Sequence, residues 1–142
     1  MGEASKNEAD ARTERAMAKA AALGRAKRAE SRAALALIST FVNDANAAGI
    51  ATTRLKARSY NGESRYSTNV TGWYIRKDRS IGVGDDGQFY VLSAPTSLLA
   101  RFRGVNISPS DPPMELGRGA RDGESIALAD ALTNRLDAGN DY

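Results

Sequence analysis

The sequence predicts an α+β fold: a four-stranded antiparallel meander covered by an amphipathic helix, with a C-terminal helix and a basic N-terminal helical extension. Three observations support this fold class. Turn-forming residues separate short runs of alternating apolar and polar residues between Thr53 and Ser93. Apolar residues recur at helical spacing just before this stretch. The first 30 residues are rich in Ala, Glu, Lys and Arg, which favour helix.

Length and composition limit the class of protein. The chain has 142 residues, enough for one domain with a modest core. It contains no cysteine and no histidine, so it lacks disulfides, zinc–thiolate sites and the commonest metal ligand and general base. We therefore expect no enzymatic activity, no cofactor and no metal site. The apolar runs are too short to span a bilayer and the N-terminus lacks an apolar signal core, so we expect a cytoplasmic protein.

Residues 1–30 form the predicted extension, and residues 31–142 form a single α+β domain. Large apolar side chains in the extension are nearly limited to Met17 and Leu23, so no face could anchor it on a core. It is either a frayed, solvated helix or a basic arm that becomes ordered on phosphates. A coiled coil is disfavoured because apolar heptad positions are missing. The basic residues assigned to the arm are Arg15, Lys19, Arg25, Lys27 and Arg28.

The pattern changes from about Ser31, where an amphipathic helix is predicted. Its apolar stripe consists of Leu35, Ile38, Phe41, Val42 and Ala45. The helix should end near Ala48, with Gly49 as its C-cap. Because a small sheet alone is not stable in water, this helix is the natural cover for the meander.

Three turns define the meander. Asn61-Gly62 favours a two-residue type I′ turn, which requires a positive φ at both positions and pairs Arg58 with Arg65 and Thr53 with Val70. Three-residue loops are predicted at 77–79 and at 85–87, where Gly87 takes the left-handed position. A β-bulge at Gly72 would change the phase of the alternation. These registers gather one apolar face, made of Trp73, Ile75, Ile81, Val83, Phe89 and Val91. Together with Leu35, Ile38, Phe41 and Val42, all of these except Ile81 are the predicted core.

The remainder of the chain carries weaker signals. A short helical turn after Pro95 holds Leu98, Leu99 and Phe102, and a long connection over 104–123 includes a short extended piece near Met114–Leu116. A last helix runs from about Glu124 to Asp137, capped by Asp122. Its predicted packing stripe is Ile126, Ala129, Leu132 and Leu136.

Three groups of residues could suggest chemistry, and each has a simpler explanation. The Gly-rich run from Gly117 to Gly123 lacks the Gly-Lys-Ser/Thr ending of a P-loop and fits a loop and helix cap. Asp85-Asp86 and Asp78 do not match a calcium loop and fit ordinary turns. The sequence pairs no two carboxylates as a glycosidase site would require, among Glu63, Asp111, Glu115, Asp122 and Glu124.

The polar face of the meander is the strongest candidate site. The predicted registers gather there Arg54, Lys56, Arg58, Arg65, Asn69, Tyr74, Arg76 and Tyr90. Cations mixed with tyrosine and asparagine on an open sheet are typical of a nucleic-acid surface, although a polar outer face is also normal for any half-exposed sheet. Two function classes stay open. The first is a nucleic-acid-binding protein that uses this face and the arm. The second is a structural or adaptor protein whose long helix docks on a protein partner or a second copy.

Overall fold

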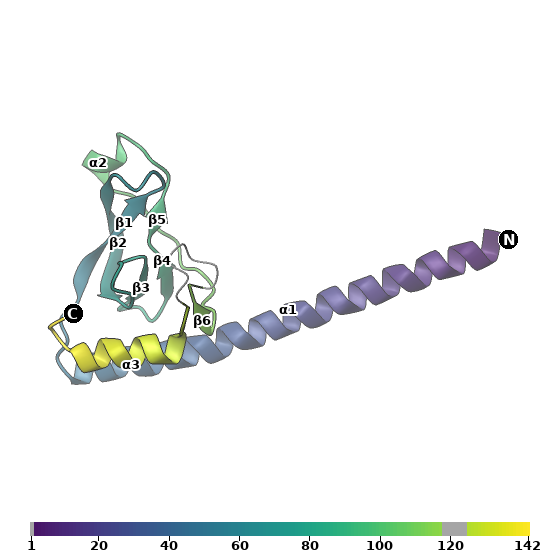
Figure 1. The fold of residues 1–142 in the computed structure, drawn as a ribbon, viewed down its shortest axis with the longest axis horizontal. Coiled ribbons are helices and arrows are strands. Elements are labelled where there is room, and N and C mark those ends of the chain that lie inside the picture. The colour runs from purple at the N-terminus through teal and green to yellow at the C-terminus, as the bar shows by residue number, and fades with distance from the viewer. Residues whose placement is uncertain (1, 118–124) are drawn as a thin grey trace.

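The structure, a computed structural model, describes residues 2–117 and 125–142 and is an α+β fold. A long helix α1 (Gly2–Ala47) and a C-terminal helix α3 (Leu128–Ala138) lie side by side beneath the sheet, and the short helix α2 (Ala100–Arg103) lies at the opposite end of the sheet (Figure 1). The elements in chain order are α1 (Gly2–Ala47), β1 (Thr53–Ser59), β2 (Arg65–Tyr74), β3 (Ile81–Gly84), β4 (Phe89–Val91), β5 (Ser93–Ala94), α2 (Ala100–Arg103), β6 (Glu115–Leu116), β7 (Ile126–Ala127) and α3 (Leu128–Ala138).

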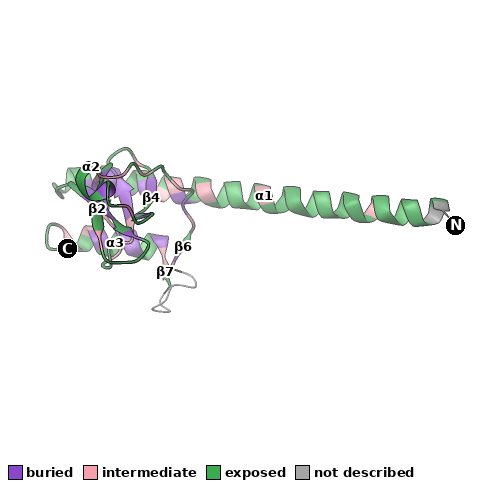
Figure 2. Cartoon of the chain, turned by 90° about the horizontal axis from the view of Figure 1, so that it is seen from above, coloured by how far each residue is buried: buried purple, intermediate pink, exposed green. Residues whose placement is uncertain are grey.

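Helix α1 joins the predicted extension and the predicted amphipathic helix into one continuous helix. Between Glu3 and Arg32, which we call the arm, the described residues are exposed except for Ala11, Gly24 and Ser31, which are half-buried. The arm projects away from the rest of the molecule (Figure 2). The predicted end of the helix is confirmed: Gly49 has a φ of +69°, and the Ile50 N–H donates to the Ala45 carbonyl at 3.0 Å.

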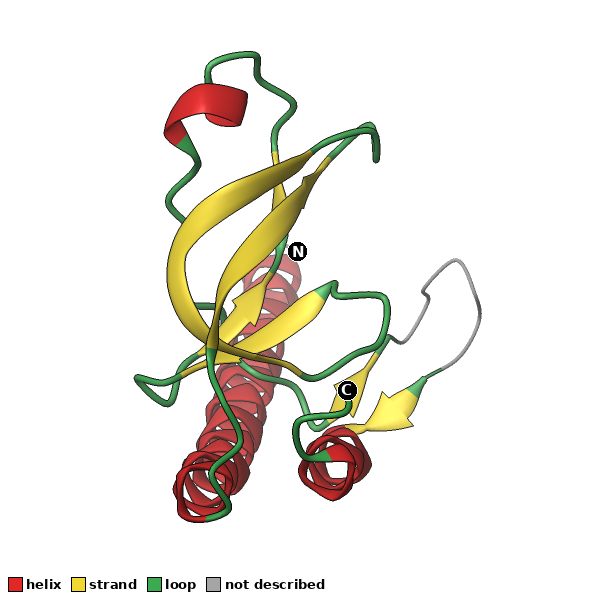
Figure 3. Cartoon of the chain, turned by 90° about the vertical axis from the view of Figure 1, so that its left-hand side faces the viewer, coloured by secondary structure: helices red, strands yellow, loops and turns green. Residues whose placement is uncertain are grey.

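The main sheet has five strands rather than the predicted four, in the order β4-β3-β2-β1-β5. Strand β5 pairs with β1 in parallel, whereas the predicted meander was antiparallel throughout. A single residue, Leu92, separates β4 from β5. The two outer strands of the sheet are thus almost one segment, and the sheet must curl back on itself to pair with both (Figure 3). The prediction was wrong because it treated residues 89–93 as one edge strand with one neighbour.

The registers of the second and third hairpins are confirmed. Trp73 pairs with Val83, and Val83 pairs with Phe89. Gly87 takes the left-handed conformation with a φ of +79°. Arg79, at the end of the other three-residue loop, has a φ of +61°. Asp78 supports this loop, because its carboxylate accepts from the N–H and the hydroxyl of Ser80.

The first hairpin differs from its prediction in two respects. Arg58 does pair with Arg65, but a register shift between Arg54 and Lys56 leaves Thr53 opposite Gly72 instead of Val70. The connection is also a wider loop of residues 60–63, in which the Ser59 N–H donates to the Ser64 carbonyl at 2.9 Å. Gly62 has a positive φ, whereas Asn61 does not. Instead, the Asn61 side chain accepts from the Glu63 N–H at 3.0 Å, which stabilises the wider loop over a type I′ turn.

The predicted bulge at Gly72 is wrong. It was needed only to bring the apolar residues to one face, whereas both faces of the sheet are buried at the end near α1 and α3. Alternation runs unbroken along β2: Tyr66, Val70 and Tyr74 face the inside of the curl, and Trp73 and Ile75 face the helices. The inner cluster of buried residues is Leu55, Ala57, Tyr66, Val70, Tyr90, Leu92, Ala94 and Ala100. The cluster against the helices includes Ile38, Phe41, Val42, Trp73, Ile75, Val83 and Phe89, as predicted.

Two members of the predicted core are not buried. Val91 is 43% exposed on the outside of the curl. Leu35 is half-buried, and its neighbour Ala34 is buried in its place. Trp73 is the centre of this core, because its ring meets Phe41 edge to face at 5.5 Å and its indole N–H donates to the Ile50 carbonyl at 3.1 Å.

The C-terminal helix begins later than predicted. Ile126 belongs to β7 and pairs with Leu116 of β6, so the extended piece near Met114–Leu116 is confirmed and α3 starts only at Leu128. Ala129 is exposed, and α3 buries Leu128, Ala131, Leu132 and Arg135. Asp122, Glu124 and most of the Gly-rich run lie outside the described residues.

Candidate nucleic-acid interface

Strands β1 and β2 carry part of the predicted basic surface on their outer face. Lys56, Arg58 and Arg65 are exposed there, and the structure pairs Arg58 directly with Arg65. Arg54 is also exposed, but its guanidinium donates to the Thr68 carbonyl at 3.1 Å. Like charges at directly opposite positions of a sheet destabilise it, so the Arg58–Arg65 pair costs free energy unless an anion lies over it.

The tyrosines predicted to share this surface lie on the inner face instead. Tyr90 is only 5% exposed, and its hydroxyl donates to Asp86 Oδ2 at 2.7 Å. Tyr74 is half-buried, and its hydroxyl accepts from the Lys56 backbone N–H at 2.8 Å. The prediction failed because a bulge at Gly72 was expected to turn these rings outward. They therefore offer no surface on which a base could stack.

Asn69 and Arg76 have structural roles as well. Asn69 Oδ1 accepts from the Ile107 N–H at 2.7 Å and so holds the segment that follows α2 along β2. Arg76 is half-buried and forms an ion pair with Asp78 at 3.9 Å. Of the eight predicted sheet residues, the structure thus leaves Arg54, Lys56, Arg58 and Arg65 as exposed cations on one outer face.

Helix α2 adds cations that the sequence reasoning missed. Arg101 Nη2 donates to Ser64 Oγ at 3.1 Å, which places Arg101 beside the start of β2. Arg103 lies near the same strand, because the Val105 N–H donates to the Ser67 carbonyl at 2.9 Å. Arg103 is exposed, and Phe102 between them is 87% exposed. We call Lys56, Arg58, Arg65, Arg101 and Arg103 the basic end of the sheet. The Arg-Phe-Arg triplet was the available signal, but its position beside β2 depends on how residues 95–104 fold back.

Few carboxylates balance these cations. Among the described residues, Arg76–Asp78 is the one ion pair within 4.0 Å. Burial raises the pKa of Asp78, but hydrogen bonds from Ser80 and the charges of Arg76 and Arg58 outweigh burial and hold this pKa below its usual value. The positive charge of Arg58 thus acts on Asp78 although the two side chains form no ion pair. Glu63, the carboxylate of the first hairpin loop, is exposed to solvent.

The arm does not extend this surface. Arg15, Lys19, Arg25, Lys27 and Arg28 are all exposed on α1, and α1 runs beneath the sheet at the end opposite α2 (Figure 1). The predicted arm residues and the basic end are therefore two separate regions.

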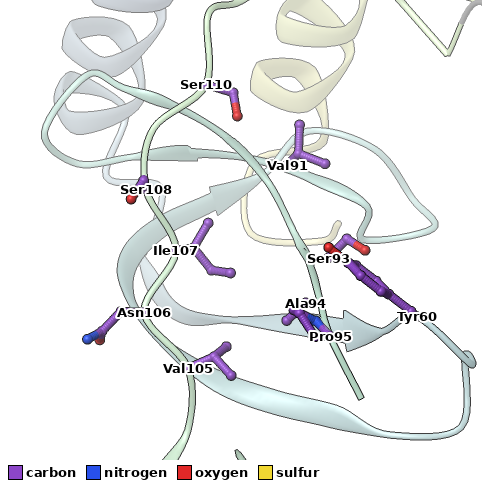
Figure 4. A pocket seen from close by; sticks show the side chains of 10 residues that line it. All are labelled: Tyr60, Val91, Ser93, Ala94, Pro95, Val105, Asn106, Ile107, Ser108 and Ser110. Atoms are coloured by element: carbon purple, nitrogen blue, oxygen red, sulfur yellow. The ribbon is translucent and has the colours of Figure 1, made fainter. Parts of the chain in front are cut away.

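A groove opens between the β4–β5 segment and residues 105–110, with a volume of about 700 Å³. Val91, Ser93, Val105, Ile107 and Ser108 are among its lining residues (Figure 4). The side chains that line it are uncharged, so it adds nothing to anion binding. It does explain the exposure of Val91, which was predicted to be buried.

No group of three or more potential metal-binding side chains is found within residues 2–117 and 125–142. In the same part of the chain, no helix combines the length and the hydropathy needed to cross a bilayer. Comparison with protein-family models, with curated proteins and with solved structures finds no match for this chain.

Proposed function

We propose that the protein binds nucleic acid through the basic end of the sheet. The observation that carries this proposal is the direct pairing of Arg58 with Arg65, flanked by Lys56, Arg101 and Arg103, with no ion pair to a described carboxylate. A phosphate backbone supplies closely spaced anions that would relieve this repulsion, and arginine can bind phosphate through two parallel hydrogen bonds. The exposed Phe102 ring, rather than Tyr74 or Tyr90, is the aromatic group available for contact with a base.

The test is binding of the full chain to labelled single-stranded and double-stranded oligonucleotides across a salt series. The double variant Arg58→Ala/Arg65→Ala should weaken binding of both. It should also reduce the slope of log K against log salt by about two, because two phosphate contacts are lost. The matched control, Lys6→Ala/Lys77→Ala, removes the same charge from exposed positions away from the basic end and should change affinity much less.

Two results would contradict the proposal. In one, the intact protein does not bind near physiological salt. In the other, the control double variant weakens binding as much as the basic-end double variant, so that net charge alone matters. A deletion of residues 1–28 tests the arm separately. If only this deletion weakens binding, the arm is a nonspecific electrostatic tail and the sheet has no role.

The second candidate function is that of a structural or adaptor protein that acts through α1. The arm favours it, because a solvated helix of this length contributes little to the core of its own domain.

A further inference from the structure

The charges of the arm are divided along its length. Four of the six charged side chains before Arg15 are carboxylates, and six of the seven from Arg15 to Arg32 are basic. The carboxylates of the first half are Glu3, Glu8, Asp10 and Glu14, accompanied by Lys6 and Arg12. The second half carries Arg15, Lys19, Arg25, Lys27, Arg28 and Arg32, accompanied by Glu30. The arm is therefore a rod with one acidic end and one basic end.

A rod with this distribution is complementary to a reversed copy of itself. We propose that the arm pairs with the arm of a second copy of the chain in antiparallel orientation. Full overlap sets Glu3 of one copy beside Arg32 of the other. The same overlap sets Asp10 beside Arg25 and within one turn of Arg28, and these residues share the helix face that carries Met17. Each contact occurs twice because the pair has two-fold symmetry. A parallel pair would instead place like charges side by side.

The length of the arm fits this overlap. Near its C-terminal end the domain begins to contact α1, where the Met114 N–H donates to Glu30 Oε1 at 3.0 Å. A partner arm that starts beside Arg32 therefore stops where the domain begins, and the overlap covers roughly 45 Å of helix. Met17 lies at the middle of the overlap, and its side chain is 67% exposed in the single chain. The many alanines of the arm let two helices approach closely, so that the flanking charges can meet.

A second copy explains the arm better than a nucleic acid does. A phosphate backbone would attract the half from Arg15 to Arg32 but repel the four carboxylates of the first half. The arm of a second copy instead offers basic side chains to the acidic half and carboxylates to the basic half. This self-association does not rest on nucleic-acid binding by the basic end. Arg58→Ala/Arg65→Ala leaves the arm unchanged, and the charge reversals in the arm leave the basic end unchanged.

The first test is the molar mass of the full chain in solution, measured by sedimentation from micromolar to millimolar concentration. The mass should rise from 15.1 kDa to twice that value at low salt. Asp10→Lys/Glu14→Lys and Arg25→Glu/Arg28→Glu should each be monomeric, because like charges face each other across a homodimer of either variant. An equal mixture of the two variants should again dimerise, since every reversed charge then faces its opposite. The control Glu63→Lys/Asp111→Lys reverses two exposed carboxylates outside the arm and should dimerise like the wild type.

The second test fixes the orientation and uses the absence of cysteine from the chain. Met17→Cys should form a disulfide-linked dimer on mild oxidation, because the two central residues face each other. Lys6→Cys should not, because antiparallel arms hold these residues ~35 Å apart, far beyond disulfide reach. A chain that stays monomeric throughout overturns the proposal. Two other results do the same: charge-reversed variants that dimerise like the wild type, and a Lys6→Cys variant that cross-links as readily as Met17→Cys.

Discussion

The hydroxyl of Tyr90 gives a quantitative test of the inner cluster. Its ring lies inside the curled sheet, and its hydroxyl donates to Asp86 Oδ2 at 2.7 Å. Burial, together with the hydrogen bond and negative charge of Asp86, raises the pKa of Tyr90 from 10.0 to about 12. The folded protein therefore keeps this proton over a pH range in which the unfolded chain loses it.

The sign and size of the effect follow from this shift. Stabilisation by the neutral hydroxyl is complete below pH 10 and is lost as the pH rises towards about 12. Two pKa units correspond to about 3 kcal/mol, but water partly screens the hydroxyl beside the exposed Asp86, so the free energy of unfolding should fall by about 1 to 2 kcal/mol across this range. Tyr90→Phe should lower the free energy of unfolding at neutral pH by about 2 kcal/mol, through loss of the hydrogen bond to a carboxylate. It should also flatten the alkaline fall.

The assay is urea unfolding, followed by circular dichroism from neutral to alkaline pH, for the wild type and for Tyr90→Phe. Tyr60→Phe is the matched control, because the Tyr60 side chain is 71% exposed and its loss should change neither quantity. Burial also raises the pKa of Tyr142, so a Tyr142→Phe background separates the two contributions. A Tyr90→Phe variant that retains the full alkaline fall would refute this role of the hydroxyl. Tyrosinate absorbance that shows Tyr90 ionising together with the exposed tyrosines would refute it too.

Three further predictions concern stability. Gly72→Ala should lower the free energy of unfolding in urea by about 3 kcal/mol, because the added methyl group would overlap the Val83 carbonyl. Gly62→Ala, whose methyl group enters open space at a φ of +75°, should lower it by only about 1 kcal/mol. Equal losses in the two variants would contradict the predicted overlap at Gly72. Arg135→Met should lower the free energy of unfolding by about 2 kcal/mol and the melting temperature by several degrees. The reason is that Nε and Nη1 of this buried arginine donate to the Tyr74 and Gly139 carbonyls. An unchanged melting curve would exclude this role. Deletion of residues 1–28 should leave the thermal midpoint and the buried-indole fluorescence of the domain unchanged, because the deleted residues are almost all exposed; a marked fall would mean that the arm supports the core.

Local turn chemistry predicted the part of the sheet that forms between neighbours in sequence. The loops at 77–79 and 85–87 have residues suited to their backbone, Asp78 and Gly87, and each fixes the register of its hairpin. The end of α1 at Gly49 was predictable for the same reason. In each case the decisive interactions lie within a few residues of one another.

The features of the fold that could not be predicted from the sequence depend on contacts between segments far apart in the chain. Nothing local indicates that β5 returns to β1, so the curl and its second buried face were missed. Without the curl, Tyr74 and Tyr90 were placed on a solvent-exposed face. Val91 was placed in the core, and although its predicted pairing with Ile81 is confirmed, its side chain is 43% exposed. Arg135 was missed because a charged residue is buried only when partners elsewhere, here two backbone carbonyls, are available. The basic end was half predicted: Arg58 and Arg65 follow from the hairpin, whereas Arg101 and Arg103 require the fold.

The single-residue junction at Leu92 has a consequence for the order of folding. The β2–β3 and β3–β4 hairpins close loops of three residues and can form early. The β1–β5 pair joins Arg58 to Ser93 across the whole sheet, so its loop-closure entropy is larger and it should form last. Until it does, the inner cluster is open to water on one side, and the N–H groups of Arg58 and Tyr60 lack the carbonyls of Leu92 and Ala94. The seam between β1 and β5 is thus where local opening of the native domain should begin, with hydrogen exchange at these two amides as its signature.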